Sequence, residues 1–224
     1  MKIIFVGKFF WFLLASFSFF AFFMFQLAWN RGEINEAAIY NMLLFPCLLL
    51  IFYPVVFGIQ NDEDNRILEI IFGIPNYRFK VWGLRMLMVY VANYFILVAF
   101  AYVSRILLYP VNIAEMAAQL IFPMLFFGNL AFMFSTITRS GNGTAVLMIL
   151  IGLFMFILVN SNTGSGQSIT NTFWNVFLNP FQTPSVHPVI WHNTIVKSRM
   201  FLIIGGGVFL MIGLLNLQKR ERFV

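Results

Sequence analysis

The sequence predicts an all-α integral membrane protein with six transmembrane helices, and three observations support this fold class. Of the 224 residues, 61% are hydrophobic and only 10% are charged, whereas a soluble domain has roughly 45–50% apolar and about 25% charged residues. The apolar residues form six long runs. Most Lys and Arg residues lie between or beside these runs, as expected for a chain that crosses a bilayer repeatedly.

The six apolar runs are predicted to be helices because a lipid-exposed backbone must satisfy its own hydrogen bonds. A transmembrane β-barrel would show segments of about ten residues with alternating polarity, which are not seen here. No internal repeat or separate soluble domain is visible, so residues 1–224 are predicted to form a single transmembrane domain. The expected spans are residues 9–29, 38–59, 84–104, 117–137, 145–159 and 200–217.

Two of these spans need separate justification. The first span lacks the small-x-small cleavage pattern of a signal peptide, and it is longer than the apolar region of a signal peptide. We therefore expect it to be retained. The fifth, 145–159, has 15 residues and would reach about 22 Å at ~1.5 Å per residue, which is short for a core of about 30 Å. In the polar connection that follows it, residues 168–181 are rich in Phe and Trp, which predicts a re-entrant or interfacial helical hairpin on the outer face.

The distribution of basic residues predicts that both termini are cytoplasmic, which also agrees with an even number of spans. In that orientation ten of the 14 basic residues lie inside and four outside, as the positive-inside rule requires. The ten are Lys2, Lys8, Arg66, Arg78, Lys80, Arg85, Arg139, Lys219, Arg220 and Arg222, and the four are Arg31, Arg105, Lys197 and Arg199. The net charge of +6 is therefore interpreted as a topology signal and not as a nucleic-acid interface.

The connection between the second and third spans is unusually charged. Residues 61–80 hold four of the eight acidic residues and three of the 14 basic ones. Asn61 is a candidate N-cap with Asp62, Glu63 and Asp64 in the first turn, where carboxylates suit the helix dipole. Gly73 and Pro75 are typical of a helix end. A short cytoplasmic helix over residues 62–72 is therefore predicted.

The predicted helix has two different faces. Asp62, Arg66 and Glu69 share one face, and Leu68 and three Ile residues share the other. One interpretation is an amphipathic helix that lies on the inner leaflet. The polar face is acid-rich, however, whereas binding to anionic lipid alone favours Lys and Arg, so a protein partner suits the helix better.

The segment "ILEIIFGIPNYRFKVWGLRML" and the acids before it resemble the cytoplasmic loop of ABC-2-type permeases, the membrane subunits of type-2 ABC exporters. Leu68 and Glu69 match the Leu-Glu pair of that loop, Pro75 matches its proline, and Arg78 and Lys80 match its basic positions. The usual Gly-Thr is replaced here by Arg66-Ile67. Six spans, a small second cytoplasmic loop at 138–144 and a basic tail also fit, and the haem-export permease of cytochrome c maturation is a less well matched relative.

The resemblance implies that residues 62–72 form a coupling helix, in which Asp62, Glu63, Arg66, Leu68, Glu69 and Pro75 contact a separate ATPase subunit. It implies a permease in a bacterial inner membrane that pairs with a second copy or a paralogous permease. The expected substrate is an amphipathic or hydrophobic peptide, lipid or glycolipid. No cofactor is expected in this chain, because ATP and Mg²⁺ would bind to the partner ATPase.

Motifs for chemistry are absent from the sequence. There is no P-loop, metalloprotease or nucleophile-elbow motif, so we expect no enzymatic activity of this chain. Cys47 is the single cysteine, which excludes an intrachain disulfide and a Cys/His zinc site. His187 and His192 lack partner ligands and are interpreted as surface residues, so no metal site is predicted.

Four polar side chains inside the spans are candidates for a substrate path: Asn93, Tyr94, Gln119 and Asn129. Interhelical hydrogen bonds are the alternative role for these residues. Arg85 is expected to extend to the inner headgroups, with contact to substrate as the alternative. A channel, secondary carrier or membrane scaffold remains the other functional class, although a carrier more often has inverted repeats and charges at the membrane midplane.

Overall fold

The computed structural model describes residues 9–29, 34–64, 77–162, 174–182 and 187–217. These residues form helices and turns, with no strand among them. Six of the helices are long and apolar enough to cross a membrane, which confirms the predicted fold class. The helical elements are α1 Phe9–Trp29, α2 Glu36–Val56, α3 Gly58–Asp64, the π-helix η1 Arg78–Gly83, α5 Leu84–Leu107, α6 Ile113–Thr138, α7 Gly141–Asn162 and α8 Pro188–Asn216.

The predicted spans agree with the observed helices except at the fifth and sixth. Helix α7 has 22 residues, or about 33 Å, so the prediction of a short fifth span is wrong. Polar residues at both of its ends belong to the helix although they interrupt the apolar run. Helix α8 has 29 residues and begins twelve positions before the predicted span. Lys197 and Arg199 therefore lie in a helix and not in an outer loop.

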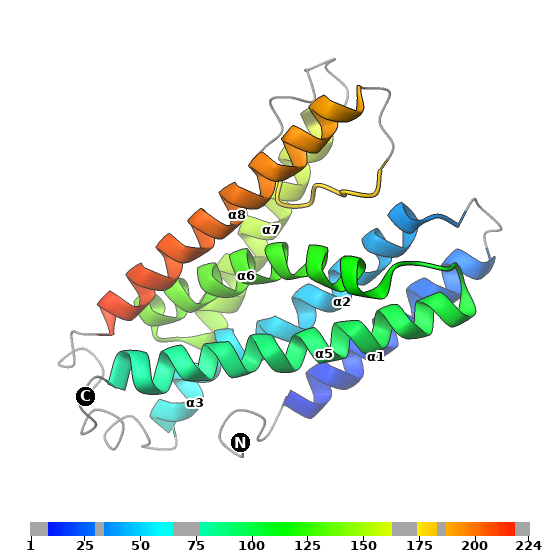
Figure 1. The fold of residues 1–224 in the computed structure, drawn as a ribbon. Coiled ribbons are helices and arrows are strands. Elements are labelled where there is room, and N and C mark those ends of the chain that lie inside the picture. The colour runs from blue at the N-terminus through cyan, green and yellow to red at the C-terminus, as the bar shows by residue number, and fades with distance from the viewer. Residues whose placement is uncertain (1–8, 30–33, 65–76, 163–173, 183–186, 218–224) are drawn as a thin grey trace.

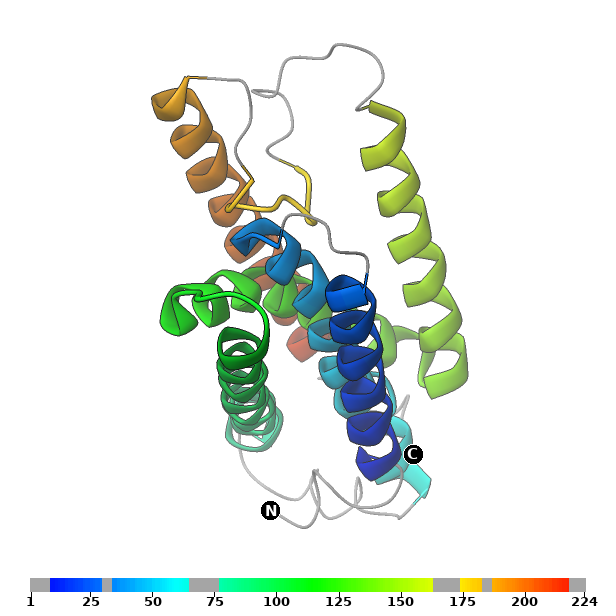
Figure 2. The same ribbon diagram turned by 90° about the vertical axis from the view of Figure 1, so that its right-hand side faces the viewer.

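Helices α2 and α6 form the centre of the bundle (Figure 1). Of the apolar stretch in each, 67% is buried, against 11% in α1 and 17% in α7. Helix α6 packs along α8 on one side and against α2 on the other, and α7 stands at the edge of the bundle (Figure 2). Large apolar side chains of α1 and α7 remain exposed, as expected for surfaces that contact lipid.

Aromatic contacts attach the peripheral helix α1 to this centre. The ring of Phe20 stacks on Phe100 of α5 with 4.5 Å between centroids, and the ring of Phe12 stacks on Tyr53 of α2 at 4.9 Å. Other aromatic residues of α1, such as Trp11 and Phe22, are more than half exposed. The Phe-rich first span therefore combines a packing face with an outward face.

Residues that are far apart in the sequence meet at one end of the bundle, which we call the α3 end. Phe9, at the start of α1, lies 6.4 Å from Tyr53 of α2 between ring centroids. The hydroxyl of Tyr77 donates a hydrogen bond to the carbonyl of Leu217, just after α8. The described chain thus starts and finishes at the same end, as six consecutive crossings require.

The connection between α6 and α7 is only two residues long. Arg139 has a left-handed backbone with φ of 56° and ends α6, and Ser140 precedes Gly141, the first residue of α7. A Cβ at Gly141 would lie 2.3 Å from Cδ1 of Phe57 and 2.6 Å from Oε1 of Gln60. The close approach to α3 therefore requires glycine at this position, and the predicted loop 138–144 is mostly helical.

At the opposite end, side-chain caps define the helix starts. Asn35 accepts a hydrogen bond from the backbone N–H of Ala38 at 2.8 Å and begins α2, and Asn112 caps α6 in the same way. We call this the Tyr40 end, after a buried residue in the first turns of α2. Both caps satisfy backbone donors that the helix itself leaves unpaired.

Residues 174–182 pack against the Tyr40 end of the bundle as a series of turns. The Asn179 amide donates hydrogen bonds to the carbonyl of Ala37 at 2.8 Å and to Oδ1 of Asn41 at 3.0 Å. Val176 and Leu178 are buried. The predicted helix over 168–181 is therefore wrong from residue 174 onward, and residues 168–173 of that prediction lie outside the described chain.

Candidate functional site

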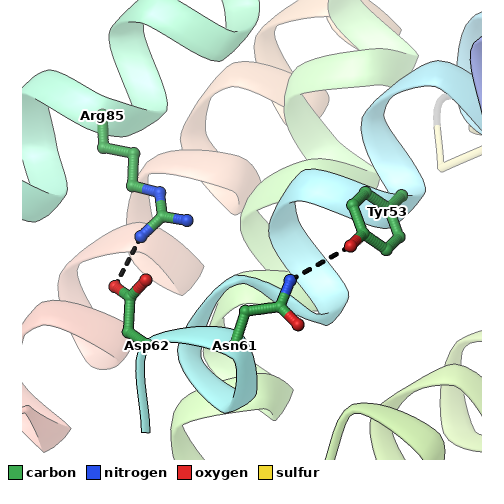
Figure 3. A network of polar contacts seen from close by, with 4 residues as sticks. All are labelled: Tyr53, Asn61, Asp62 and Arg85. Atoms are coloured by element: carbon green, nitrogen blue, oxygen red, sulfur yellow. Dashed lines mark hydrogen bonds and ion pairs between the residues drawn. The ribbon is translucent and has the colours of Figure 1, made fainter. Parts of the chain in front are cut away.

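The α3 end contains a buried ion pair between two helices. Nη1 of Arg85, in the first turn of α5, lies 2.5 Å from Oδ2 of Asp62 in α3 (Figure 3), and the two side chains are 9% and 2% exposed. It is the only ion pair that joins two of the described residues. Removing one partner of a buried pair leaves an uncompensated charge and typically costs about 3–5 kcal/mol. The pair therefore fixes the position of α3 relative to α5.

The Arg85 guanidinium has further contacts that hold it in place. It lies 5.1 Å from the centroid of the Trp82 ring, a cation–π arrangement. Nη2 passes close to Gly58, where an added Cβ would be in van der Waals contact at 3.6 Å. Trp82 belongs to the π-helix η1, and π-helical turns occur frequently at functional sites.

Helix α3 is also joined to its other neighbours by hydrogen bonds. Asn61 donates from Nδ2 to the hydroxyl of Tyr53 in α2 at 3.2 Å (Figure 3). Gln60 accepts at Oε1 from the backbone N–H of Gly141 in α7 at 2.6 Å. Together with the ion pair, these contacts connect α3 to α2, α5 and α7.

Residues 65–76, which follow α3, are thus bracketed by anchored positions. Before this segment, Asp62 is paired with Arg85 of α5. After it, Tyr77 is hydrogen-bonded to Leu217 at the end of α8. The described residues on the two sides of this segment therefore have contacts with α2, α5, α7 and the end of α8.

Several predictions for this region require correction. Asn61 is not an N-cap, because its backbone N–H donates to the carbonyl of Phe57 within a helix that begins at Gly58. Asp62 is buried and paired with Arg85, so Arg85 does not extend to the headgroups. Glu63 lies in α3. Arg66, Leu68, Glu69 and Pro75, with most of the predicted helix 62–72, lie outside the described residues.

A second buried cation lies at the Tyr40 end. Arg199 of α8 is 6% exposed, although it belongs to a helix long enough to span the membrane. Its Nε donates to Oε1 of Gln119 in α6 at 2.9 Å. Its Nη2 donates to the carbonyl of Leu178 at 3.2 Å and to the hydroxyl of Tyr40 at 3.4 Å. Sequence reasoning placed Arg199 in the outer connection and missed this site.

The four predicted substrate-path residues have different surroundings. Gln119 contacts Arg199, and Asn129, ten positions later in α6, accepts at Oδ1 from the hydroxyl of Tyr90 at 2.7 Å. Asn93 of α5 is buried with neither side-chain polar atom hydrogen-bonded, and Tyr94 is half-buried. Two of the four therefore make the interhelical hydrogen bonds that were the alternative prediction.

An apolar cavity of about 690 Å³ lies between α2, α6 and α7. Asn41 is its one polar lining side chain, and none of the four predicted path residues lines it. Its size suits a ligand as large as a drug molecule. The remaining lining residues are Leu44, Phe45, Leu48, Ile51, Phe52, Phe127, Ala131, Met148, Ile149, Gly152, Leu153, Phe156 and Phe177.

Within the described part of the chain, no group of His, Cys, Asp and Glu residues is arranged to hold a metal ion. His187 is exposed and accepts at Nδ1 from the backbone N–H of Val189, and His192 is exposed as well. Comparison with protein families, with curated proteins and with solved structures found no match. The resemblance to ABC-2-type permeases therefore remains a prediction from the loop residues.

Proposed function

We propose that this chain is the membrane subunit of an ATP-driven exporter of the ABC-2 type. It would carry an amphipathic or hydrophobic substrate, such as a peptide, lipid or glycolipid, out of the cytoplasm or the inner leaflet. ATP and Mg²⁺ would bind to a separate ATPase subunit. The functional unit would contain a second copy of this chain, or a paralogous permease, in a bacterial inner membrane.

The attachment of residues 65–76 at both ends is the observation that best supports this proposal. A coupling element must pass the movement of an ATPase to the spans, so it needs rigid connections on each side. The Asp62–Arg85 ion pair and the Tyr77–Leu217 hydrogen bond provide such connections. In the proposed orientation the α3 end faces the cytoplasm, where the ATPase would bind.

The buried charges favour this proposal over a secondary carrier. A carrier typically has ionisable residues near the midplane, where they bind the coupling ion. Here Arg85 and Asp62 lie at the α3 end of their helices. Arg199 contacts Tyr40, only four residues after the start of α2. These buried charges are therefore near opposite ends of the bundle.

The proposal is tested by copurification from native membranes through a tag on this chain. Wild type should retain an ATPase subunit that contains a P-loop, and Glu69→Lys should weaken its binding. A charge reversal at a docking face can cost several kcal/mol when the partner presents a base there. Arg66→Glu, on the same predicted face, should also reduce binding.

Glu115→Lys is the matched control, because it is the same charge reversal on an exposed residue at the opposite end of the bundle. It should leave copurification unchanged. If residues 62–72 only bind the membrane surface, Glu69→Lys should strengthen attachment to anionic lipid instead. Equal ATPase recovery with wild type, Glu69→Lys and Arg66→Glu would contradict the coupling role.

A further inference from the structure

Arg199 is a buried cation that has only neutral acceptors among the described residues. Its three hydrogen bonds go to the Gln119 amide, the Tyr40 hydroxyl and the Leu178 carbonyl. The ring of Phe122 covers the guanidinium at 5.4 Å from its centroid. Nη1 is buried and has no hydrogen-bond partner. No described acid lies within ion-pair distance of Arg199.

Among the described residues, this arrangement leaves a charge without a counterion. Burying a cation is costly unless it is paired, and buried charges in proteins are normally paired or bound to a ligand. Arg85 at the other end of the bundle follows this rule, because it has Asp62. Because no described acid supplies a counterion for Arg199, its surroundings point to a ligand.

The depth of Arg199 in the bundle limits what this ligand is. Tyr40 is four residues from the start of α2, and Gln119 is six residues from the start of α6, which places them about 6 and 9 Å along their helices at ~1.5 Å per residue. The guanidinium therefore lies near the boundary between headgroups and hydrocarbon. The anions found at that depth are the phosphates of lipid headgroups.

We infer that Arg199 binds the phosphate of an anionic lipid headgroup. The planar guanidinium matches phosphate oxygens in a two-point geometry, and Nη1 is the nitrogen left to donate. A phosphate oxygen would take the place of the Leu178 carbonyl at Nη2. Leu178 belongs to residues 174–182, which are held by turns and side-chain contacts rather than by a continuous helix. The inference is independent of the proposed transport function, because it is measured on the isolated chain.

The test compares the binding of phosphatidylglycerol and phosphatidylcholine to the purified chain in detergent, with bound lipids counted by native mass spectrometry. Wild type should bind phosphatidylglycerol at least tenfold more tightly than phosphatidylcholine. Arg199→Gln should abolish that preference. Arg199→Lys, which keeps the charge but loses the planar guanidinium, should reduce it severalfold. Arg105→Gln is the matched control on an exposed arginine at the same end of the bundle, and it should behave as wild type.

A purely structural role for Arg199 predicts a different result, in which the variants lose stability and keep the lipid preference of wild type. That result would overturn the inference, and so would equal binding of both lipids by wild type. If Arg199→Gln does not fold, Arg199→Lys distinguishes lipid binding from a purely structural role by the ratio of the affinities for phosphatidylglycerol and phosphatidylcholine. Inorganic phosphate is a separate arm. If it displaces phosphatidylglycerol at equal concentration, the site binds free phosphate and the lipid assignment is wrong.

Discussion

Removing the charge of Asp62 should destabilise the bundle strongly and specifically. In Asp62→Asn the carboxylate that lies 2.5 Å from Nη1 of Arg85 is replaced by a neutral amide of similar size. Arg85 would then be a buried cation without a counterion. Because both side chains are less than one-tenth exposed, solvent screens this loss very little.

The expected loss of unfolding free energy is about 3–5 kcal/mol for Asp62→Asn and also for Arg85→Gln. The double variant has no buried charge left, so it should lose less than the sum of the two single variants, by at least about 1 kcal/mol. Arg105→Gln removes an exposed arginine from the last turn of the same helix. Its effect should stay within about 0.5 kcal/mol.

The measurement is unfolding of the purified chain in mixed micelles by titration with a denaturing detergent, with helicity as the signal. Assembly with any partner does not enter the result, because only the isolated chain is present. Losses below about 1 kcal/mol in both single variants would refute the account of the ion pair. Additive effects in the double variant would show that the two side chains do not interact.

Three other predictions concern close packing, a helix cap and the topology. Gly141→Ala should cost about 1–3 kcal/mol by overpacking because its Cβ would overlap Phe57 and Gln60, whereas Gly152→Ala, with nothing within 4 Å, should be neutral or slightly stabilising when both are compared in the same unfolding titration. Asn35→Ala should cost about 1 kcal/mol through loss of the α2 cap, and an unchanged unfolding midpoint would contradict that role. The topology test uses Lys80 and Gln182 because both are exposed. In a Cys47→Ala background, Lys80→Cys should be protected from an impermeant thiol reagent added outside whole cells and Gln182→Cys should react, while equal labelling would reject the proposed orientation.

The fold class was predictable because it depends on composition and run length, which are local properties of the sequence. The described part of the first span, Phe9–Trp29, is helical throughout, as its uninterrupted apolar run predicted. The fifth and sixth spans were misjudged for one reason. Helices continue beyond the hydrocarbon core into polar sequence, as Pro188–Arg199 does in α8, and hydrophobicity alone marks only the apolar part.

The candidate site was less predictable because its contacts join distant parts of the chain. Helical spacing placed Asp62 on one face with Arg66 and Glu69, whereas its observed partner, Arg85, is 23 residues away. A useful signal was nevertheless present: an acid at the end of one span and an Arg at the start of the next are each costly to bury alone and can neutralise each other. Arg199 gave no such signal, because its acceptors come from three separate segments.

ATP hydrolysis by the assembly isolated through this chain tests the proposed function most directly. We predict that the isolated assembly hydrolyses ATP and that the activity stays with a separate P-loop subunit when the two are dissociated. The stripped chain should be inactive, since its sequence has no P-loop. Hydrolysis by the stripped chain, or an isolated assembly without any ATPase subunit, would contradict the proposal.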